Sequence, residues 1–542
     1  MPPKASQLLG PFIGNVTSSS AMIWLQIPHL AGGEIRTVFV TVHEAGASAP
    51  IEFARAAAAA YDNLNVGTVK FDGLEPDTVY YYKLWQDEER ATPLDLNGLT
   101  ENDLHFRTLP QNGFDDQLDF LLMSCHNPGT SPGDGADGFA VWARIPEIIA
   151  ENQNVRFALL VGDQVYGDEI ETELKKEPGL RKRQELYLKL YQKFWDNLYY
   201  RRVLCSLPAF LMWDDHDITD GWGSRDDSFV DDHSATFDKS WLRLFEAGRS
   251  AFRQMQASRN PEPLSKDYKD GFDFCFKVGR AGFAVPDLRS NRNVRLPRIM
   301  SEAQLDGIRK WVADNQQNLD VLFFISTVVF SHGAPEIDRG IIKYWIYLLD
   351  FSHWLARFAP VRALARRFHI KVGDIRDDIN DSWGADVNSA ETDRVLDFLF
   401  ELQNPTDPKN ALNVVILSGD IHTPGYSTLY SADAKHARKA LIPHIVATPV
   451  AFRAFPWMAE AMLRHRTITV ALGKKETYSA QVSHHYCYRN VVILSLRKFE
   501  PSEMQLKVKY YLEHHPEPQI MLFDLNRSSH RETIEWESLP QQ

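Results

Sequence analysis

The hydrophobic pattern of the chain changes once, near residue 111, and this change limits the folds that the chain can adopt. Before it, short stretches such as residues 21–27 and 78–84 alternate apolar and polar side chains between turns rich in Gly, Pro and Asn. Several short strands of this kind, without helical spacing, predict an immunoglobulin/fibronectin-like β-sandwich over residues 1–110. The alanine-rich stretch 54–60 is expected to form a surface turn or a short helix.

Beyond residue 111, short apolar runs alternate with amphipathic stretches of helical spacing. The alternation predicts an α/β domain over residues 111–525, with layered sheets flanked by helices, followed by a C-terminal tail over 526–542. A chain of 542 residues exceeds the size at which one hydrophobic core keeps growing, which agrees with two domains. The expected strands are residues 120–123, 155–161, 209–213, 321–329 and 414–417, and the clearest expected helices are residues 139–151, 184–198 and 301–315.

Five of the expected strands run directly into residues of metal-ligand type. Because ligands gather at the carboxyl ends of strands in α/β sheets, we expect these clusters to lie close together. A single Gly-Asp after a strand is a common turn, so the signal is the recurrence of the pattern. The clusters are Ser124-Cys125-His126, Gly162-Asp163 with Tyr166 and Asp168, Asp214-Asp215-His216-Asp217, Ser331-His332, and Ser418-Gly419-Asp420-Ile421-His422.

The cluster from Asp214 to Asp217 is the strongest single indication of a cation site. Three carboxylates beside one histidine repel one another unless cations or cationic side chains compensate them. A solvated acidic turn is the alternative, but it fits poorly after the apolar run Phe210-Leu-Met-Trp213.

Two arginines, Arg289 and Arg292, follow another strand-like run in the motif Asp287-Leu-Arg289-Ser-Asn-Arg292. The planar guanidinium suits bidentate contact with phosphate oxygens, which predicts contact with an anionic substrate. An ion-pair network that supports the acidic clusters is the alternative, and the sequence leaves both open.

The formal net charge of -13 argues against binding to duplex nucleic acid, which is held through clustered Lys and Arg. The first ten residues show no export signal and no apolar run is long enough to span a membrane, so the default expectation is a soluble cytoplasmic protein. An apolar and aromatic insertion, residues 334–374, carries several arginines. Its amphipathic part, residues 341–368, suggests peripheral contact with a membrane or lipid, and packing on the core or at a subunit contact is the alternative. The oligomeric state is left open.

The ordered motifs resemble those of the PhoD-like alkaline phosphatases, which belong to the calcineurin-like metallophosphoesterases. The resemblance spans nearly the whole chain and implies an N-terminal β-sandwich before a layered metallophosphoesterase domain. Because relatives of this type are often exported, export is the alternative to a cytoplasmic location. The motifs are Gly162-Asp163-x-x-Tyr166-x-Asp168, Trp213-Asp214-Asp215-His216-Asp217, Asp220-Gly221-Trp222, Asp287-x-Arg289-x-x-Arg292, Asp381-x-Trp383 and Leu417-Ser418-Gly419-Asp420-x-His422.

The resemblance also implies roles for individual residues. Asp163 would bridge two metals, and His216 would act on the substrate phosphate or on the leaving group. Arg289 is a further catalytic candidate, and Arg292 and His332 are candidates for substrate binding. The implied metal ligands are Cys125, Asp163, Tyr166, Asp215, Asp420 and His422.

Thiolate, phenolate and imidazole ligands suit Fe³⁺, and carboxylates suit Ca²⁺, so this pair of metals is expected, with Mn²⁺ or Zn²⁺ as alternatives. The first motif reads Ser124-Cys125-His126 where the wider superfamily has Asp-x-His, Asp215 stands where it has the Asn of Gly-Asn-His, and Gly419-Asp420-Ile421-His422 replaces Gly-His-x-His. These departures make metal assignments from other branches unsafe. The expected reaction is hydrolysis of a small-molecule phosphate ester by a metal-activated hydroxide. Phosphodiesterase or phospholipase D-like activity is the alternative, followed by a catalytically silent binding protein.

Overall fold

The structure is a computed structural model of the 542-residue chain. It describes most of the residues that the motifs occupy. The described residues are 8–46, 53–111, 117–129, 138–224, 239–265, 271–293, 296, 298–331, 380–452, 468–475, 477–500 and 503–525.

The N-terminal part forms an antiparallel sheet of seven strands in the order β1-β2-β5-β4-β3-β6-β7. β4 and β5 share a single pair of residues, Ala60 and Val66, so the sheet divides into two halves that enclose a common core. This arrangement confirms the predicted sandwich-like fold. The strands are β1 Leu9–Val16, β2 Ser20–Gln26, β3 Ile35–Glu44, β4 Phe53–Ala60, β5 Val66–Asp72, β6 Val79–Trp85 and β7 His105–Arg107.

The alanine-rich stretch is a strand, so the prediction of a turn or short helix was wrong. It forms β4 and pairs along its length with β3. Ala57 and Ala59 are fully buried and alternate with exposed neighbours, which is the period of a strand. The intrinsic preference of alanine for helices is overridden here by pairing with β3, because strand preference depends strongly on context.

The second part of the chain contains two sheets that pack face to face. The first has the order β10-β9-β8-β19-β20-β21, and the second has the order β11-β12-β13-β14-β16-β15-β18-β17. Both contain parallel strands, namely β8, β9 and β10 in one and β12, β13, β14 and β16 in the other. The first sheet consists of β8 Gln117–Met123, β9 Val155–Val161, β10 Ala209–Met212, β19 Asn490–Glu500, β20 Glu503–Leu512 and β21 Gln519–Asp524. The second consists of β11 Phe274–Val278, β12 Ala281–Val285, β13 Val321–Ser326, β14 Asn413–Ser418, β15 Gly425–Ser431, β16 Leu441–Val446, β17 Ile468–Leu472 and β18 Tyr478–His485.

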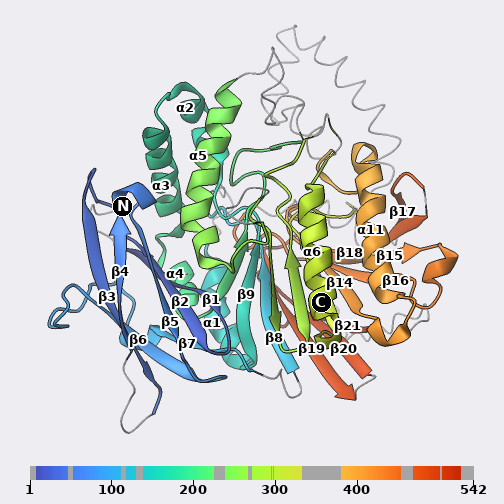
Figure 1. Ribbon diagram of the computed structural model, residues 1–542, viewed down its shortest axis with the longest axis horizontal. Coiled ribbons are helices and arrows are strands. Elements are labelled where there is room, and N and C mark those ends of the chain that lie inside the picture. The colour runs from blue at the N-terminus through green and yellow to red at the C-terminus, as the bar shows by residue number, and fades with distance from the viewer. Residues whose placement is uncertain are drawn as a thin grey trace.

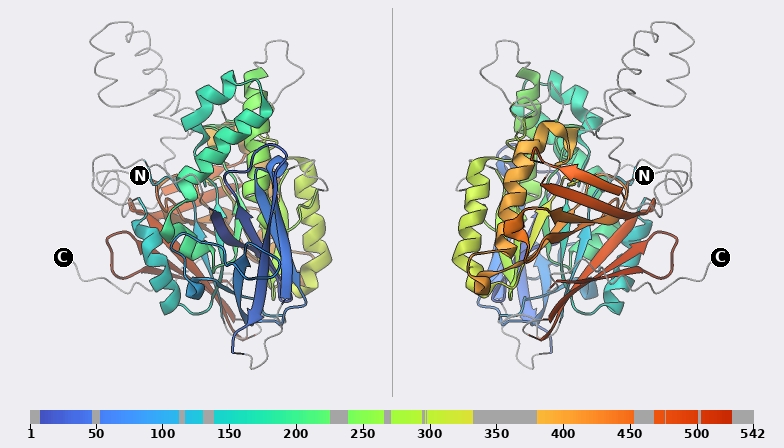
Figure 2. Two further views of the ribbon diagram at one scale, coloured as in Figure 1. Left: turned by 90° about the vertical axis from the view of Figure 1, so that its left-hand side faces the viewer. Right: turned by 90° about the vertical axis from the view of Figure 1, so that its right-hand side faces the viewer.

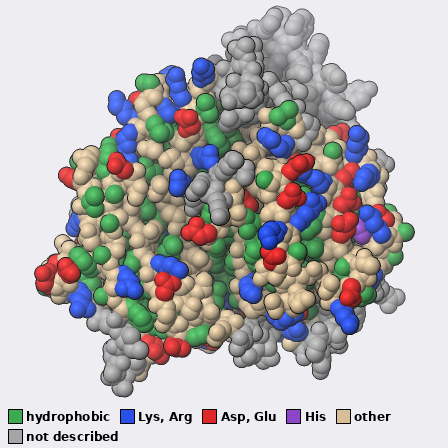
Figure 3. All heavy atoms as spheres, in the orientation of Figure 1, with side chains coloured by type: hydrophobic (Ala, Val, Ile, Leu, Met, Phe, Trp, Pro, Cys, Tyr) green, Lys and Arg blue, Asp and Glu red, His purple; other side chains and the backbone are tan. Residues whose placement is uncertain are grey.

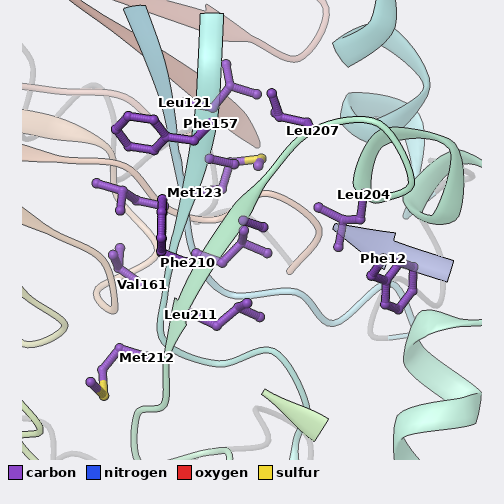
Figure 4. Close-up of a cluster of buried hydrophobic side chains, with 14 of the residues drawn as sticks. Phe12, Leu121, Met123, Phe157, Val161, Leu204, Leu207, Phe210, Leu211 and Met212 are labelled. Carbon is purple, nitrogen blue, oxygen red and sulfur yellow. The ribbon is translucent and has the colours of Figure 1, made fainter. Parts of the chain in front are cut away.

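Aromatic side chains fill the space between the two sheets. Phe120 of β8 meets Phe283 of β12 and Phe323 of β13 edge-on, with ring centroids 5.3 and 5.2 Å apart. Edge-to-face contacts of this kind are favourable beyond the area they bury. Figure 4 shows neighbouring side chains of β8, β9 and β10, with Phe12 of β1 and Leu204 at the edge of the cluster. The hydrophobic core therefore continues from the sheets of the second part into the N-terminal sheet.

Helices cover both outer faces of the paired sheets (Figures 1 and 2). α11 contacts β14 of the second sheet, whereas α1 contacts β19 of the first. This order of helix, sheet, sheet and helix confirms the predicted layered α/β class. The helices are α1 Ala140–Glu151, α2 Glu171–Lys176, α3 Leu180–Trp195, α4 Leu198–Leu204, α5 Lys239–Met255, α6 Glu302–Asn315 and α11 Ser389–Gln403.

The surface over α6 and α11 carries interspersed positive and negative side chains (Figure 3). Arg394 pairs with Glu302 at 3.1 Å and Lys310 pairs with Asp314 at 2.8 Å. Within the described parts of the chain, the helices are too short or too polar to cross a membrane.

Candidate active site

The turns that follow β8, β9 and β10 of one sheet meet the turn that follows β14 of the other. Cys125 Sγ lies 3.4 Å from a carboxylate oxygen of Asp163 and 3.4 Å from the carbonyl oxygen of Asp420. The amide of His126 donates to the carbonyl of Asp163 at 2.7 Å. The two packed sheets thus bring together residues far apart in the sequence.

Two glycines allow this close approach. A Cβ atom at Gly419 would lie 2.5 Å from the carbonyl oxygen of Val161 and 2.6 Å from Ser124 Cβ. At Gly162, where φ is +94°, a Cβ atom would lie 2.7 Å from Asp214 Cβ. Side chains at these positions would push the turns apart, since real Cβ contacts are not that short.

Four of the six predicted metal ligands have left-handed backbone conformations. The φ angles are 58° at Cys125, 55° at Asp163, 73° at Asp420 and 53° at His422. Such conformations are uncommon for residues other than glycine and cost on the order of 1–3 kcal/mol each. They are typical of sites at which the surrounding structure holds side chains in place for function.

Four carboxylates lie together at the centre of the site. Ligand oxygens of Asp214, Asp215 and Asp420 lie within 4.8 Å of one another, and so do ligand atoms of Asp163, Asp215 and His216. Burial, together with the charge of the neighbouring carboxylates, raises the pKa of Asp163 and of Asp420 well above the usual range. These acids cannot all carry charge unless positive charge, from cationic side chains or from bound cations, compensates them.

Several buried polar atoms of the site have no hydrogen-bond partner within the described residues. They are Asp163 Oδ1, Asp214 Oδ2, the Tyr166 hydroxyl and His422 Nδ1. Burial, and then the charge of His216, lowers the pKa of His422 to about 3, which keeps its imidazole neutral as a metal ligand requires. Buried polar atoms without a hydrogen-bond partner are costly unless a ligand satisfies them. The acidic clusters and the neighbouring side chains therefore fit bound cations.

An aromatic side chain, Phe452, stacks on two of the predicted ligands. Its ring centroid lies 4.0 Å from that of His422 and 5.3 Å from that of Tyr166. Thr448 donates a hydrogen bond to Cys125 Sγ at 3.0 Å. The six predicted ligands thus lie around one region, and the phenyl ring of Phe452 borders it.

Arg289 is fully buried and contacts three carboxylates. Its Nε atom donates to Asp214, while Nη1 and Nη2 donate to the two oxygens of Asp381 at 2.8 and 2.7 Å. Nη2 also reaches Asp215 at 3.3 Å, and Nη1 reaches the carbonyl of Trp222 at 3.1 Å. These are the contacts of an ion-pair network, so between the two alternatives for this arginine the geometry favours support of the acidic site.

Arg292 differs from Arg289 because one of its nitrogens is unused. Nη2 donates to the carbonyl of Asp381 at 2.6 Å and lies 2.9 Å from its carboxylate. Nη1 is buried and has no hydrogen-bond partner in the part of the chain that the structure describes. Of the two arginines, Arg292 therefore retains the capacity to bind an anion.

His216 is oriented by Asp168. Its Nδ1 atom lies 2.7 Å from Asp168 Oδ2. Burial would favour neutral imidazole, but the carboxylates of Asp168, Asp215 and Asp163 outweigh it and raise the pKa of His216 well above its usual value. Because the pKa of Asp168 is lowered by His216, its carboxylate accepts and Nδ1 donates, which leaves Nε2 for another partner.

Some residues of the site were not predicted to have roles. Asp168 and Asp217 stand within the quoted motifs, and Asp381 begins another, so acidic residues beside predicted ligands were the available signal. Phe452 gave no signal, because a phenylalanine outside the motifs does not differ in the sequence from one in the core.

Other predictions fall on residues that the structure does not describe. His332, the insertion 334–374 with its amphipathic part 341–368, and the tail 526–542 lie outside the described residues.

Comparison with known proteins gives matches at the level of family and fold. Residues 120–321 match the family model described as PhoD-like phosphatase. The match with a solved structure of PhoD covers 100% of this chain and 94% of the PhoD chain, with a TM-score of 0.63 and 16% sequence identity. An uncharacterized protein of Saccharomyces cerevisiae is 21% identical over an alignment of 428 residues, and the match covers 65% of this chain and 56% of the relative. The chain thus spans a little over half the length of that relative.

Proposed function

We propose that this protein is a metal-dependent hydrolase of small phosphate esters. Residues 120–321 match the family model of PhoD-like phosphatases, and the chain has the fold of PhoD, as its motifs predicted. The observation that carries the proposal is the group of buried carboxylates with unpaired oxygens at Asp163 and Asp214. Such a group is unfavourable in a protein that holds no cation. A binding protein without catalytic activity would not need these buried carboxylates, so their presence argues against that alternative.

The cations would be held by two kinds of ligand. Cys125, Tyr166 and His422 offer donors that suit Fe³⁺, whereas Asp215 and Asp420 offer oxygens that suit Ca²⁺. Asp163 stands between both groups and would serve both ions. Bound cations of this kind lower the pKa of water, neutralise phosphoryl oxygens and align an in-line displacement.

Three side chains near the proposed cation sites would complete the reaction. His216 would hold a proton on Nε2 and transfer it to the departing oxygen, while Asp168 fixes the ring through Nδ1. Arg292 would place its unused Nη1 against a phosphoryl oxygen. Phe452 would keep bulk water away from His422 and Tyr166.

Substrate assays with and without chelator test the proposal directly. The purified protein should hydrolyse an aryl phosphate monoester, and treatment with a chelator should remove that activity until metal is restored. A bis-aryl diester in the same assay separates monoesterase from phosphodiesterase action. Absence of hydrolysis of both esters, with the metal sites filled, would contradict the proposal.

Replacing His216 with alanine is expected to slow hydrolysis by about 10²-fold or more while bound metal stays in place, because a proton donor rather than a ligand is lost. Metal analysis of the variant beside its turnover measures both quantities. Asp168→Asn should lower the rate by a smaller factor, since the ring remains but its orientation weakens. Loss of metal from His216→Ala would instead make this histidine a ligand, which its proximity to Asp163 and Asp215 permits.

Iron(III) bound by Cys125 and Tyr166 would colour the protein. Phenolate and thiolate ligands transfer charge to Fe³⁺, so Tyr166→Phe should shift or bleach the visible band while the fold persists. Phe452→Leu is a control, because it removes a ring that stacks on Tyr166 without removing a ligand atom. A colourless, active protein that contains Mn²⁺ or Zn²⁺ and lacks iron would rule out this assignment.

A further inference from the structure

The end of α5 and the turn that follows it, residues 254–260, lie between the N-terminal sheet and the candidate active site. On the side of the sheet, the indole nitrogen of Trp24 donates to the carbonyl of Gln254 at 3.0 Å. A Cβ atom at Gly14 of β1 would lie only 2.8 Å from the carbonyl oxygen of Arg259. The sheet therefore approaches this segment backbone to backbone.

Arg259 is fully buried in a cage of aromatic rings. The carbon at the centre of its guanidinium lies 5.0 Å from the ring centroid of Phe12, 5.2 Å from that of Trp24 and 5.1 Å from that of Trp195. Two of these rings belong to the N-terminal sheet and the third ends α3. Burial removes water from the guanidinium, and cation–π attraction to the three rings offsets part of that cost, so the contact links the two parts of the chain through Arg259.

On the opposite side, the same segment reaches the turns that carry the predicted ligands. Gln256 Nε2 donates to Asp217 Oδ1 at 2.8 Å and to the hydroxyl of Tyr191 at 2.9 Å. Asp217 Oδ2 accepts the backbone amides of Asp163 and Asp214, each at 2.9 Å. Both Asp217 oxygens are therefore occupied by donors of the protein.

These hydrogen bonds join the ends of two neighbouring strands. Asp163 follows β9, and Asp214 follows β10, and each bears a buried carboxylate oxygen with no partner among the described residues. The backbone of Asp163 is also held in a left-handed conformation. A strained turn keeps its geometry only if surrounding contacts fix it, and Asp217 supplies two of those contacts.

We propose that Asp217 and Gln256 form a clamp that fixes the two turns bearing Asp163 and Asp214, and that the N-terminal sheet holds this clamp through Trp24 and Arg259. The clamp residues are positioning residues, because they act through the turns and not on substrate. The sheet is accordingly a part of the catalytic unit and not a separate binding module. This proposal rests on the proposed function, because the clamp matters for activity only if the two turns hold cations.

Substitutions in the clamp test its first half. Gln256→Leu keeps the approximate shape and removes both donated hydrogen bonds, so the affinity for metal should fall by about 10- to 100-fold, as for other residues that orient ligands. Gln256→Glu should lower it further, because two carboxylates would then face each other. The double variant Asp217→Asn with Gln256→Glu reverses the direction of the same hydrogen bond and should restore much of the affinity.

Gln403→Leu is the matched control. Gln403 is also buried and makes two hydrogen bonds, to the carbonyl of Leu441 and from the amide of Val414. These partners lie at the amino ends of β16 and β14, away from the turns of the site. Its replacement should lower thermal stability without changing the affinity for metal.

The second half of the proposal is tested by one pair of tryptophan variants. Trp24→Phe removes the hydrogen bond to Gln254 and thins the cage, so metal affinity should fall, by less than in Gln256→Leu. Trp85→Phe makes the same chemical change in the same sheet, where the indole donates to Thr41 at 3.0 Å. It should leave the affinity unchanged.

Titration of the metal-free protein, prepared with a chelator, with Ca²⁺ and with Fe³⁺ gives the affinities. Hydrogen exchange of the backbone amides of residues 160–166 and 212–220 measures how firmly the clamp holds the two turns, without any metal. Exchange in both stretches should be faster in Gln256→Leu than in Gln403→Leu. Equal exchange and equal affinity in these two variants would overturn the clamp, and equal behaviour of the two tryptophan variants would overturn the role of the sheet. A wild-type protein that binds none of Ca²⁺, Fe³⁺, Mn²⁺ and Zn²⁺ would refute the proposed function, while the exchange measurement would still decide the clamp.

Discussion

Replacing Asp163 with alanine is expected to abolish phosphate ester hydrolysis and to lower the bound metal, because one carboxylate would be serving both cations. The loss in kcat should reach at least about 10³-fold, the upper end for removal of a single preorganised electrostatic group. Turnover of an aryl phosphate and metal content after dialysis measure the two effects together.

A second variant separates this effect from damage to the fold. Asp163→Asn keeps the size of the side chain, and asparagine tolerates the left-handed backbone at this position. Asp119→Asn is its control, because Asp119 is a buried aspartate on the neighbouring strand β8 that accepts hydrogen bonds from Gln117 rather than facing the site. Wild-type turnover with full metal content in either Asp163 variant would remove Asp163 from the site.

Replacing Arg289 with methionine should produce the largest loss of stability of any single change at the site. The substitution leaves Asp214, Asp215 and Asp381 buried with one fewer positive charge among them. Breaking a buried ion pair by removing one partner costs about 3–5 kcal/mol, and here one arginine serves three partners. Denaturant unfolding of the metal-free protein measures the difference in the free energy of unfolding.

Arg309→Met provides the comparison, since Arg309 makes an exposed pair with Asp306 on α6. Its free energy of unfolding should change by no more than about 0.5–1 kcal/mol. Arg289→Lys should lie between the two, because lysine keeps the charge but cannot form the bidentate contact with Asp381. A change in Arg289→Met no larger than that in Arg309→Met would mean that the carboxylates do not depend on this arginine.

The strands that carry the site could be predicted from the sequence because each is a short apolar run that ends in polar residues. The run at residues 155–161 is found unchanged as β9, and the expected strand 414–417 is extended by one residue at each end in β14. The change from apolar to polar residues at the end of each buried strand marks its boundary in the sequence, so the clusters at Asp163 and Asp420 could be located as well. Residues 184–198, in contrast, were expected as one helix but belong to α3 and α4, which Asp196 and Asn197 separate.

Contacts that depend on tertiary packing could not be predicted. Arg289 and Arg292 occupy one motif, yet only the packed structure distinguishes the arginine saturated by carboxylates from the one with an unused nitrogen. Gln256 lies 39 residues from Asp217 and has no motif of its own. Alternation of apolar and polar residues gives the face of a strand but not the partner across the core.

The close approach at Gly419 has a consequence for how the chain folds. Cys125 and the carbonyl of Asp420, which lie in contact across this glycine, are separated by 295 residues of sequence. The entropic cost of closing so long a loop must be met before the contact between these segments can stabilise the fold. Neither sheet alone contains all the predicted ligands. The proposed ligand set, with Asp163 and Asp215 from one sheet and Asp420 and His422 from the other, would therefore be complete only in the finished molecule, after β14 has joined the strands that precede it in the chain.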